Sequence, residues 1–294
     1  MIGFTSFRRF LLASAVLGFA AHAAAAELAL TLDVYNPGTS AIFPVTSVLV
    51  SGSKEAVLVD AQFGKAQAEQ VVEKIRASGK QLTTIYISHG DPDYYFGLDT
   101  LIRAFPQAKV LASAPTVAHI KATVDGKLAF WGPKMGADVP AKTIVPEVLK
   151  GNRLMLEGRE LEVIGLDGPQ PDRSFVWIPS LKAVVGGVVV AQGIHVWMAD
   201  TQSAQSHQDW LATLQRIQAL QPKTLVPGHY LGDGPHSAAA AQFTADYIKA
   251  FDEETARAKD SAQLIAAMKQ RYPDLGEASS LELSAKVAKG EMKW

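Results

Sequence analysis

The stretch from residue 85 to residue 98, IYISHGDPDYYFGL, carries more chemically capable side chains than any other segment of the chain. Its histidine and two aspartates, His89, Asp91 and Asp93, alternate along the sequence. The glycine and the proline between them favour a loop over a helix. Imidazoles and carboxylates are ligands of divalent cations, so this spacing indicates a metal site. The alternative is a turn in which Asp-Pro-Asp caps a helix and the histidine is structural.

The residues around this stretch predict that it lies at the end of a strand. Residues 84–87 are β-branched and aromatic, which is typical of a buried strand, and apolar residues return at helical spacing from Phe96. A strand, a polar loop and a helix in that order place the loop at the carboxyl end of the strand, where α/β proteins bind ligands. The three side chains are therefore expected to converge at one edge of a sheet.

The rest of the chain predicts two β-rich halves, each followed by helices. The expected strands are residues 28–35, 42–50, 56–59, 84–87, 109–112, 153–156, 159–164, 175–178, 183–190 and 224–226, and the expected helices include 66–78, 114–124 and 204–220. Residues 125–150 are rich in glycine and proline and are predicted to be a surface excursion. Such a segment is either a lid or substrate wall, or a mobile insertion without a role.

The two ends of the chain have their own composition. Residues 1–26 predict a secretory signal peptide, with Arg8 and Arg9 before a short apolar core and small-residue cleavage sites, so we expect a periplasmic or secreted protein. The arginine pair loosely resembles a twin-arginine signal, but its spacing favours the ordinary secretory route. Residues 27–236 are expected to form the main domain, and residues 237–294 a helical extension packed on it. Exchange of these helices in a homodimer would give the same pattern.

Composition excludes several kinds of partner. The 294 residues include 28 Lys and Arg and 29 Asp and Glu, for a net charge of −1, without basic clusters. This argues against nucleic acid, and against an anionic membrane once the signal is cleaved, and leaves a small molecule as the expected ligand. The chain has no cysteine, so disulfides and thiolate ligands are excluded and any metal must be held by His, Asp or Glu.

The order of elements and four motifs resemble the metallo-β-lactamase superfamily over nearly all of residues 30–235. The motifs are VLV followed by AVLVD at 48–60, SHGDPDY at 88–94, RSFVWIP with AVVGG at 173–187, and VPGH at 226–229. This resemblance implies an α/β fold, a four-layer αββα sandwich. Loops at one sheet edge would hold one or two metal ions, normally through a His-x-His-x-Asp-His motif.

The motif of this chain is only partly that of the family. His89 matches the first histidine, Asp93 the aspartate, and His229 the final histidine of the family pattern, so the resemblance implies that these three are metal ligands. Asp91 stands where the second histidine belongs and is a chemically reasonable substitute ligand. Tyr94 replaces the last histidine of the motif.

Two further ligand positions of the family are also replaced. A Gly-His-Thr segment appears here as Gly168-Pro169-Gln170, and the bridging aspartate as Val188. Valine cannot bridge two cations, so a dinuclear site is not expected. One divalent ion, zinc or else manganese or iron, is the expectation, and a metal-free polar cluster is the alternative.

Two functions follow from these residues. The first is an exported, mononuclear metal-dependent hydrolase of a small ester, lactone or amide-like substrate. In it, Asp93 or Asp91 orients or deprotonates a bound water, and Tyr94 donates a hydrogen bond to the oxyanion, unless its role is structural. The second is a metal-free, non-catalytic protein that binds a ligand in the same cleft. A carboxylate at position 91 favours the first.

Two other residues are candidates for the cleft. His195 is either a replacement ligand or, as the commoner case, a histidine packed at the surface by Trp197. Arg173 is either a group that binds a substrate carboxylate or part of an exposed pair with Asp172.

Overall fold

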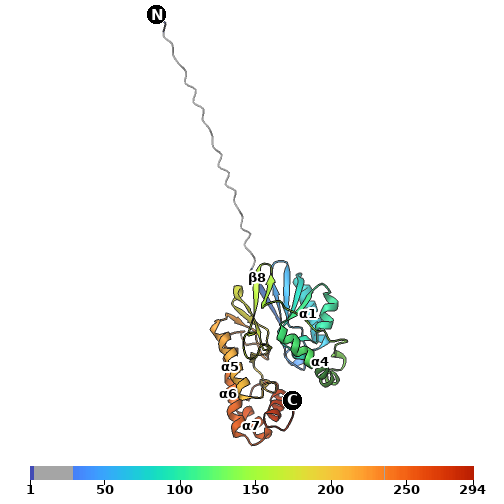
Figure 1. Ribbon diagram of the computed structural model, residues 1–294, viewed down its shortest axis with the longest axis vertical. Helices are drawn as coiled ribbons and strands as arrows, with labels where there is room; N and C mark the ends of the chain where they lie inside the picture. The colour runs from blue at the N-terminus through green and yellow to red at the C-terminus, as the bar shows by residue number, and fades with distance from the viewer. Residues whose placement is uncertain (3–28, 235) are drawn as a thin grey trace.

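The computed structural model describes residues 1–2, 29–234 and 236–294 (Figure 1). The predicted signal peptide lies outside the described residues, apart from the first two positions. Within the described part of the chain, no helix combines the length and the apolar character needed to cross a membrane.

Two sheets form the centre of the molecule. The six-stranded sheet has the order β1-β2-β3-β4-β5-β6 and the five-stranded sheet the order β12-β10-β9-β8-β7, and β11 pairs with β13 beside them. The strands are β1 (Thr31–Tyr35), β2 (Ser47–Ser51), β3 (Glu55–Val59), β4 (Gln81–Ile87), β5 (Lys109–Ala112), β6 (Glu147–Val148), β7 (Arg153–Leu156), β8 (Arg159–Ile164), β9 (Phe175–Ile178), β10 (Ala183–Val185), β11 (Ala191–Gln192), β12 (Thr224–Leu225) and β13 (His229–Tyr230). β3, β4 and β5 are parallel neighbours, so their carboxyl ends meet at one edge.

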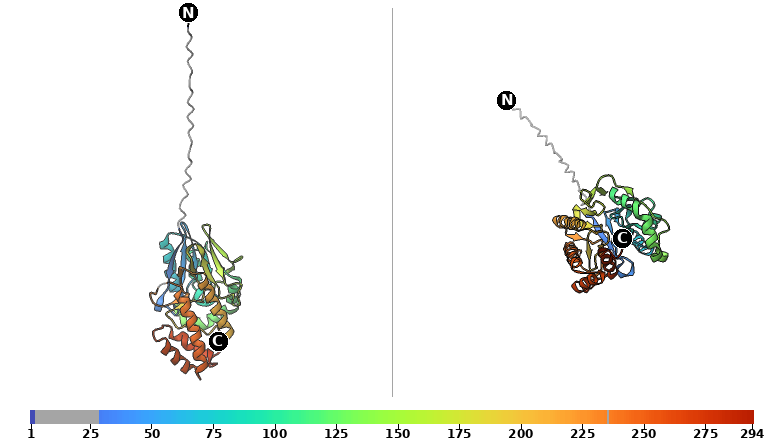
Figure 2. Two further views of the ribbon diagram at one scale, coloured as in Figure 1. Left: turned by 90° about the vertical axis from the view of Figure 1, so that its left-hand side faces the viewer. Right: turned by 60° about the horizontal axis from the view of Figure 1, so that its bottom comes forward.

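Helices cover the outer faces of both sheets. They are α1 (Lys65–Ser78), α2 (Pro92–Tyr95), α3 (Leu98–Ala104), α4 (Ala114–Met135), α5 (Ala204–Ala219), α6 (Ala239–Arg257), α7 (Ser261–Arg271) and α8 (Ala278–Ala288). In Figure 1, α1 and α4 lie on one side of the strands and α5 and α6 on the other. The expected αββα sandwich is therefore confirmed. α7 and the carboxyl terminus lie at the end of the molecule away from β8 (Figures 1 and 2).

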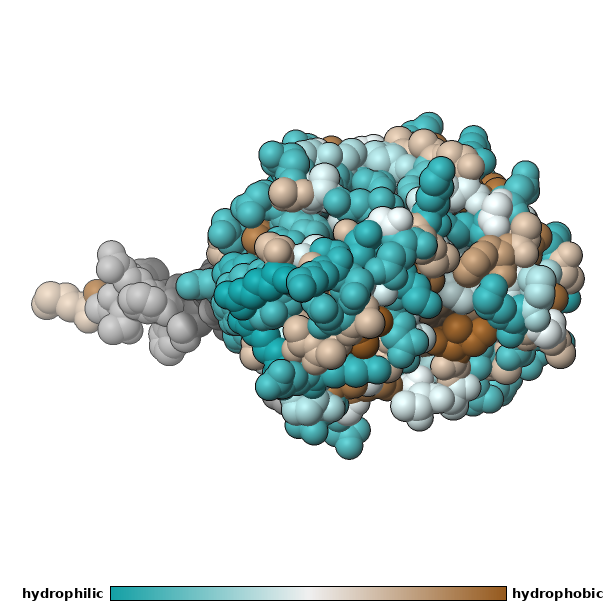
Figure 3. All heavy atoms as spheres, turned by 90° about the horizontal axis from the view of Figure 1, so that it is seen from below, coloured by the Kyte–Doolittle hydropathy of each residue, from teal (hydrophilic) through white to brown (hydrophobic). Residues whose placement is uncertain are grey.

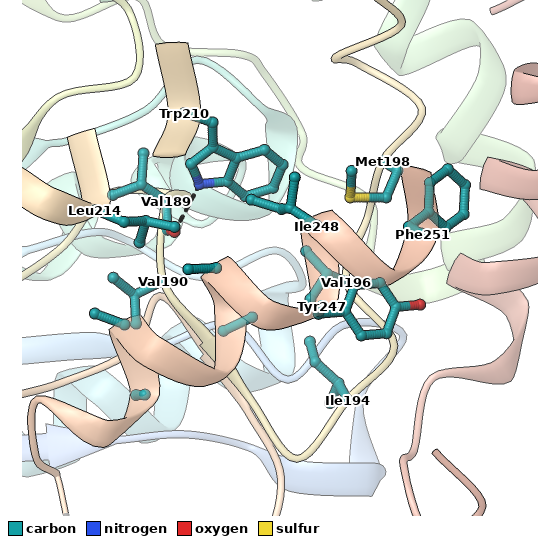
Figure 4. Packing of buried hydrophobic residues seen from close by; sticks show 14 of the residues in the cluster. Val189, Val190, Ile194, Val196, Met198, Trp210, Leu214, Tyr247, Ile248 and Phe251 are labelled. Atoms are coloured by element: carbon teal, nitrogen blue, oxygen red, sulfur yellow. Dashed lines mark hydrogen bonds between the residues drawn. The ribbon is translucent and has the colours of Figure 1, made fainter. Parts of the chain in front are cut away.

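Three hydrophobic clusters hold the four layers together. Side chains alternate across the first sheet: Val48 and Val50 pack against the second sheet, whereas Leu49 packs under the helices. The third cluster joins the second sheet to α5 and α6 (Figure 4), where Trp210 is buried and its indole donates a 2.8 Å hydrogen bond to the carbonyl of Val189. Each fully buried side chain of this size stabilises the fold by about 1.5–3 kcal/mol.

The segment 125–150 differs from its prediction. α4 continues to Met135 through Gly126, Gly132 and Pro133, so the first half of the predicted excursion is helical. The two glycines and the proline wrongly predicted a break in the helix, because the burial of Trp131 and Met135 against the first sheet keeps this segment helical. Burying both contributes about 1.5–3 kcal/mol each, enough to offset a helical glycine at about 1 kcal/mol and a proline near the end of the helix.

Two strand predictions and the motif loop also differ. The strand expected over 183–190 ends at Val185, because Gly186 and Gly187 take positive φ angles of 69° and 83°. The strand expected over 42–50 begins only at Ser47. The motif segment is not wholly a loop: residues 92–95 form the one-turn helix α2, with proline in its first turn, where its missing N–H costs nothing.

Candidate active site

Three strand ends are tied together beneath the site. Asp60, fully buried just after β3, accepts hydrogen bonds from the backbone N–H (2.8 Å) and the hydroxyl (2.7 Å) of Ser88. The same hydroxyl accepts a 2.7 Å hydrogen bond from the N–H of Gly187, beyond β10 of the other sheet. Burial raises the pKa of Asp60 to about 7, against the lowering effect of the Ser88 hydrogen bonds. This network fixes the start of the motif relative to both sheets.

The first half of the motif forms a buried ionic cluster. His89 Nδ1 lies 3.0 Å from the carbonyl oxygen of Asp172 and Nε2 lies 3.1 Å from Asp91 Oδ2. Both partners are acceptors, so the imidazole donates from both nitrogens and is protonated. Lys127 Nζ donates to the other carboxylate oxygen, Oδ1, of Asp91 at 3.2 Å. Burial raises the pKa of Asp91, but the charges of His89 and Lys127 lower it by more and hold it well below its usual range.

His119, on α4, belongs to the same cluster. Its Nε2 lies 3.9 Å from Asp91 Oδ1 and its Nδ1 3.6 Å from Asp172 Oδ2. The ring packs so closely over Gly90 that an added Cβ there would lie 2.6 Å from His119 Cδ2. Gly90 thus leaves room for the imidazole of His119.

The second half of the motif forms a separate relay. His229 Nε2 lies 2.6 Å from Asp93 Oδ2, and its Nδ1 lies 3.2 Å from the hydroxyl of Tyr94. Because the carboxylate accepts, Nε2 carries a proton, and Tyr94 can donate its hydroxyl proton towards Nδ1. Gly228 leaves room for the Tyr94 hydroxyl, since a Cβ there would lie 2.9 Å from it and would also collide with the carbonyl oxygen of Gly187. Asp93, His229 and Tyr94 thus form a hydrogen-bonded chain.

An aromatic cavity opens beside both clusters. Its lining residues are Phe43, Pro44, Asp91, Pro92, Asp93, Lys127, Trp131, Val188, Ala191, Ile194, Val196, Trp197, Asp200, Trp210, His229, Glu277, Ser280 and Trp294. Asp91, Asp93 and His229, three of the residues singled out in the sequence, thus line the same cavity. Figure 3 views the molecule from the end where α7 lies; this face is mainly hydrophilic, with hydrophobic atoms surfacing in small groups.

Several residues of the cavity could not be found from the motif. Lys127 and Trp131 lie on α4, in the segment predicted as a surface excursion. Both side chains line the cavity. Asp200 accepts hydrogen bonds of 2.6 Å from the indoles of both Trp197 and Trp294. Trp294 comes from the far end of the chain, so no local signal connects it with the motif.

The donor set does not fit a single metal ion as it is arranged. Within the described ranges, no group of three or more His, Asp or Glu residues is placed to hold a metal. The four expected ligands form two separate imidazole–carboxylate pairs, and a protonated His89 has no lone pair for a cation. Lys127 already supplies positive charge to Asp91. The metal expected from the resemblance stays a prediction, and no step below depends on it.

The remaining candidates have other surroundings. Tyr94 is fully buried with its hydroxyl on His229, so its placement does not support the predicted contact with an oxyanion. His195 is buried rather than at the surface, and its Nδ1 lies 3.1 Å from the hydroxyl of Tyr247. Arg173 is also buried, 4.3 Å from the ring centroid of Trp210, and its Nε and Nη2 atoms have no hydrogen-bond partner among the described residues.

Comparison with known proteins agrees with the fold. A metallo-β-lactamase family protein of Thermus thermophilus superposes with a TM-score of 0.62 at 16% identity, covering 89% of this chain and 91% of that one. At this identity the likeness concerns the fold alone.

Two curated proteins match in sequence. An atrochrysone carboxyl ACP thioesterase of Aspergillus fumigatus is 22% identical over 196 residues, which are 66% of this chain and 53% of that protein. The uncharacterized protein YobT of Bacillus subtilis is 36% identical over 73 residues, 25% of this chain and 31% of that protein. The chain spans about half, or less, of the length of these relatives.

The family model of the metallo-β-lactamase superfamily matches residues 41–229, more than half of the chain. The matched range ends on His229 and includes the whole motif from Ser88 to Tyr94. With the sandwich of two sheets and the site at one sheet edge, this match shows that the chain belongs to the metallo-β-lactamase superfamily.

Proposed function

We propose that this protein is a hydrolase of a small ester, lactone or thioester, and that the bond is cleaved at the wall of the aromatic cavity. The single observation that carries the proposal is the 2.6 Å pair of Asp93 and His229, both of which line the cavity. A carboxylate hydrogen-bonded to an imidazole can accept a proton from a water molecule while the charge that develops is shared between them. The apolar lining suits the acyl or alkyl part of such a substrate.

The chemical step uses side chains only. Asp93, held by His229, takes a proton from a water molecule as the water oxygen attacks the carbonyl carbon. The C–O or C–S bond to the leaving group then breaks, and the proton passes to the leaving alkoxide or thiolate. The products are a carboxylic acid and an alcohol or thiol, or a hydroxy acid from a lactone. Tyr94 donates a hydrogen bond to Nδ1 of His229, the ring nitrogen that faces away from Asp93. This hydrogen bond stabilises the charge that develops on the Asp93–His229 pair.

Lys127 is positioned to stabilise the oxyanion of this reaction. Its ammonium has three N–H donors, of which Asp91 accepts one, and it lines the cavity. Burial lowers the pKa of Lys127, but the nearby carboxylates raise it by more, so the ammonium stays charged at neutral pH. A charged donor at the carbonyl oxygen favours the tetrahedral intermediate over the ground state. His89 and Asp91 hold the Lys127 ammonium in place.

The distant thioesterase relative supports acyl transfer to water as the reaction class. The proposal is tested with a panel of 4-nitrophenyl esters and acyl thioesters of increasing chain length, assayed by release of nitrophenol or thiol. We expect turnover of the shorter members by the wild-type protein and its loss in His229→Gln. Turnover that His229→Gln leaves intact, or no turnover of any member, would contradict the proposal.

A ligand-binding protein without turnover is the second candidate. It is favoured by the ionic cluster of His89, Asp91 and Lys127, in which every group already has a partner. Under this proposal, a compound that fits the cavity should raise the midpoint of thermal unfolding and be recovered unchanged after long incubation.

Export is a further part of the proposal and is supported by the composition of residues 1–26 alone. Amino-terminal sequencing of the protein from a periplasmic extract should find a start close to residue 27. A protein that keeps its first residues in the cytoplasmic fraction would contradict export.

A further inference from the structure

Tryptophan is concentrated around the cavity. Four of the five tryptophans of the chain, Trp131, Trp197, Trp210 and Trp294, line it, together with Phe43. The rings also contact one another: the centroid of Phe43 lies 5.0 Å from that of Trp131 and 6.4 Å from that of Trp197. The indole ring has the strongest quadrupole of the aromatic side chains, and two of these rings already attract a cation: Lys127 Nζ lies 5.2 Å from the ring centroid of Trp294, and Arg173 lies 4.3 Å from that of Trp210.

The charged residues of the same wall are unbalanced. Four carboxylates, those of Asp91, Asp93, Asp200 and Glu277, line the cavity, whereas Lys127 is the only Lys or Arg among the described lining residues. This excess of carboxylates would repel an anionic ligand, and a neutral ligand would gain no electrostatic attraction from it. The balance of charge therefore favours a ligand that carries a positive charge.

Most of these carboxylates are already hydrogen-bonded. The two oxygens of Asp200 accept from two indoles, and those of Asp91 face His89 and Lys127. One oxygen of Asp93 faces His229. Occupied in this way, the carboxylates of Asp91, Asp93 and Asp200 offer few acceptors. A primary ammonium, which has three donors to satisfy, would suit such a wall less well than a cation without donors.

We infer that the cavity binds a quaternary ammonium group, which a substrate would carry on its acyl or alcohol part. This inference builds on the proposed function, because it names the group that anchors the ester beside Asp93 and His229. Asp200 has the central role: its carboxylate supplies charge and also fixes the indoles of Trp197 and Trp294. Methylammonium faces and aromatic rings attract each other most strongly where water is excluded.

Binding of choline, of its neutral isostere 3,3-dimethyl-1-butanol and of ethanolamine tests the inference without any turnover. The dissociation constants are measured by tryptophan fluorescence and by calorimetry on the full chain. We expect choline to bind at least about tenfold more tightly than the isostere, since a cation–π contact in a desolvated site has about that effect. Ethanolamine should be weaker than choline, because its N–H groups lose water without finding acceptors.

A matched pair of variants places the effect in the cavity. Asp200→Asn removes the charge and one of the two indole hydrogen bonds, so it should weaken choline about tenfold more than it weakens the neutral isostere. Asp167→Asn, at an exposed ion pair with Arg216, should change the binding of neither ligand. The comparison of ligands on the wild-type protein stands even where a variant fails to fold. Equal or tighter binding of the isostere would overturn the inference. Choline binding in a protein that cleaves no ester would overturn the proposed function and leave the inference standing.

Discussion

Two histidine–aspartate pairs of the same length lie in different parts of the molecule. In one, His229 Nε2 is 2.6 Å from Asp93, and both residues line the aromatic cavity. In the other, His207 Nδ1 is 2.6 Å from Asp252 and Nε2 is 2.6 Å from the carbonyl of Thr201, so the pair fastens α5 to α6. The distance within a pair does not distinguish a catalytic group from a structural one. The cavity beside the first pair does.

The largest difference between the pairs is expected from the same substitution in each. Asp93→Asn should lower kcat about 1,000-fold, because an amide cannot accept the proton of the attacking water. Its midpoint of unfolding should change little, since the amide oxygen still accepts from His229. Turnover of the ester that the wild-type protein cleaves best is the measurement, and a loss smaller than tenfold would remove Asp93 from the mechanism.

Lys127 gives a second test of the difference between the two pairs, because its ammonium lines the same cavity as Asp93 and His229. Lys127→Met should lower kcat about 100-fold, the usual effect of losing one oxyanion donor, with a smaller change in KM. Lys134→Met is the control, since Lys134 lies on the same helix but its ammonium stacks on exposed Phe130, 3.6 Å from the ring centroid. Equal activity of the two variants would show that Lys127 has only an electrostatic role in folding.

In the structural pair, Asp252→Asn should act on stability alone. The charge-assisted hydrogen bond to His207 becomes a neutral one, and because Asp252 is partly exposed we expect a loss of only about 1 kcal/mol in the free energy of unfolding. Urea unfolding followed by circular dichroism measures it. A loss of ester turnover per folded molecule would instead make this pair part of the site.

A third, buried histidine should affect stability only at acid pH, and among the described residues its hydrogen-bond partner is the hydroxyl of Tyr247 rather than a carboxylate. Burial lowers the pKa of His195 to about 4. As the pH falls from about 6.5 to 4, the unfolded chain takes up a proton that the folded protein refuses, so His195 costs stability in this window. His195→Gln should make the urea midpoint of unfolding less dependent on pH between about 6.5 and 4. The glutamine side chain can keep a hydrogen bond to Tyr247. A profile identical to that of the wild-type protein would contradict the shift.

The sequence predicted the scaffold well, because strand and turn chemistry are local. The β-branched run before Ser88 is part of β4, and the strands expected over 153–156 and 159–164 are β7 and β8. Glu157 and Gly158 join these two strands, and both residues have a positive φ angle. The local pattern of strand, loop and helix already placed Asp91 and Asp93 at one sheet edge, whereas His229 was added to the site only through the resemblance to a family. Periodicity alone does not say which strand ends meet.

The rest of the site depends on tertiary packing. Lys127 and Trp131 were hidden because glycine and proline in their segment predict a break, and only burial against the first sheet keeps α4 helical there. Asp200 and Trp294 are separated by 94 residues, so their hydrogen bond has no sequence signature. The protonated state of His89 follows from two acceptors supplied by Asp91 and Asp172, which no spacing rule predicts.

The most direct test of the account is ester turnover by protein stripped with a chelator and shown to be metal-free by elemental analysis. The account predicts that turnover persists in this protein and disappears in Asp93→Asn prepared in the same way. Loss of turnover on stripping, restored by one equivalent of zinc, manganese or iron, would contradict a mechanism built from Asp93, His229 and Lys127 alone. It would confirm instead the metal that the motif predicts.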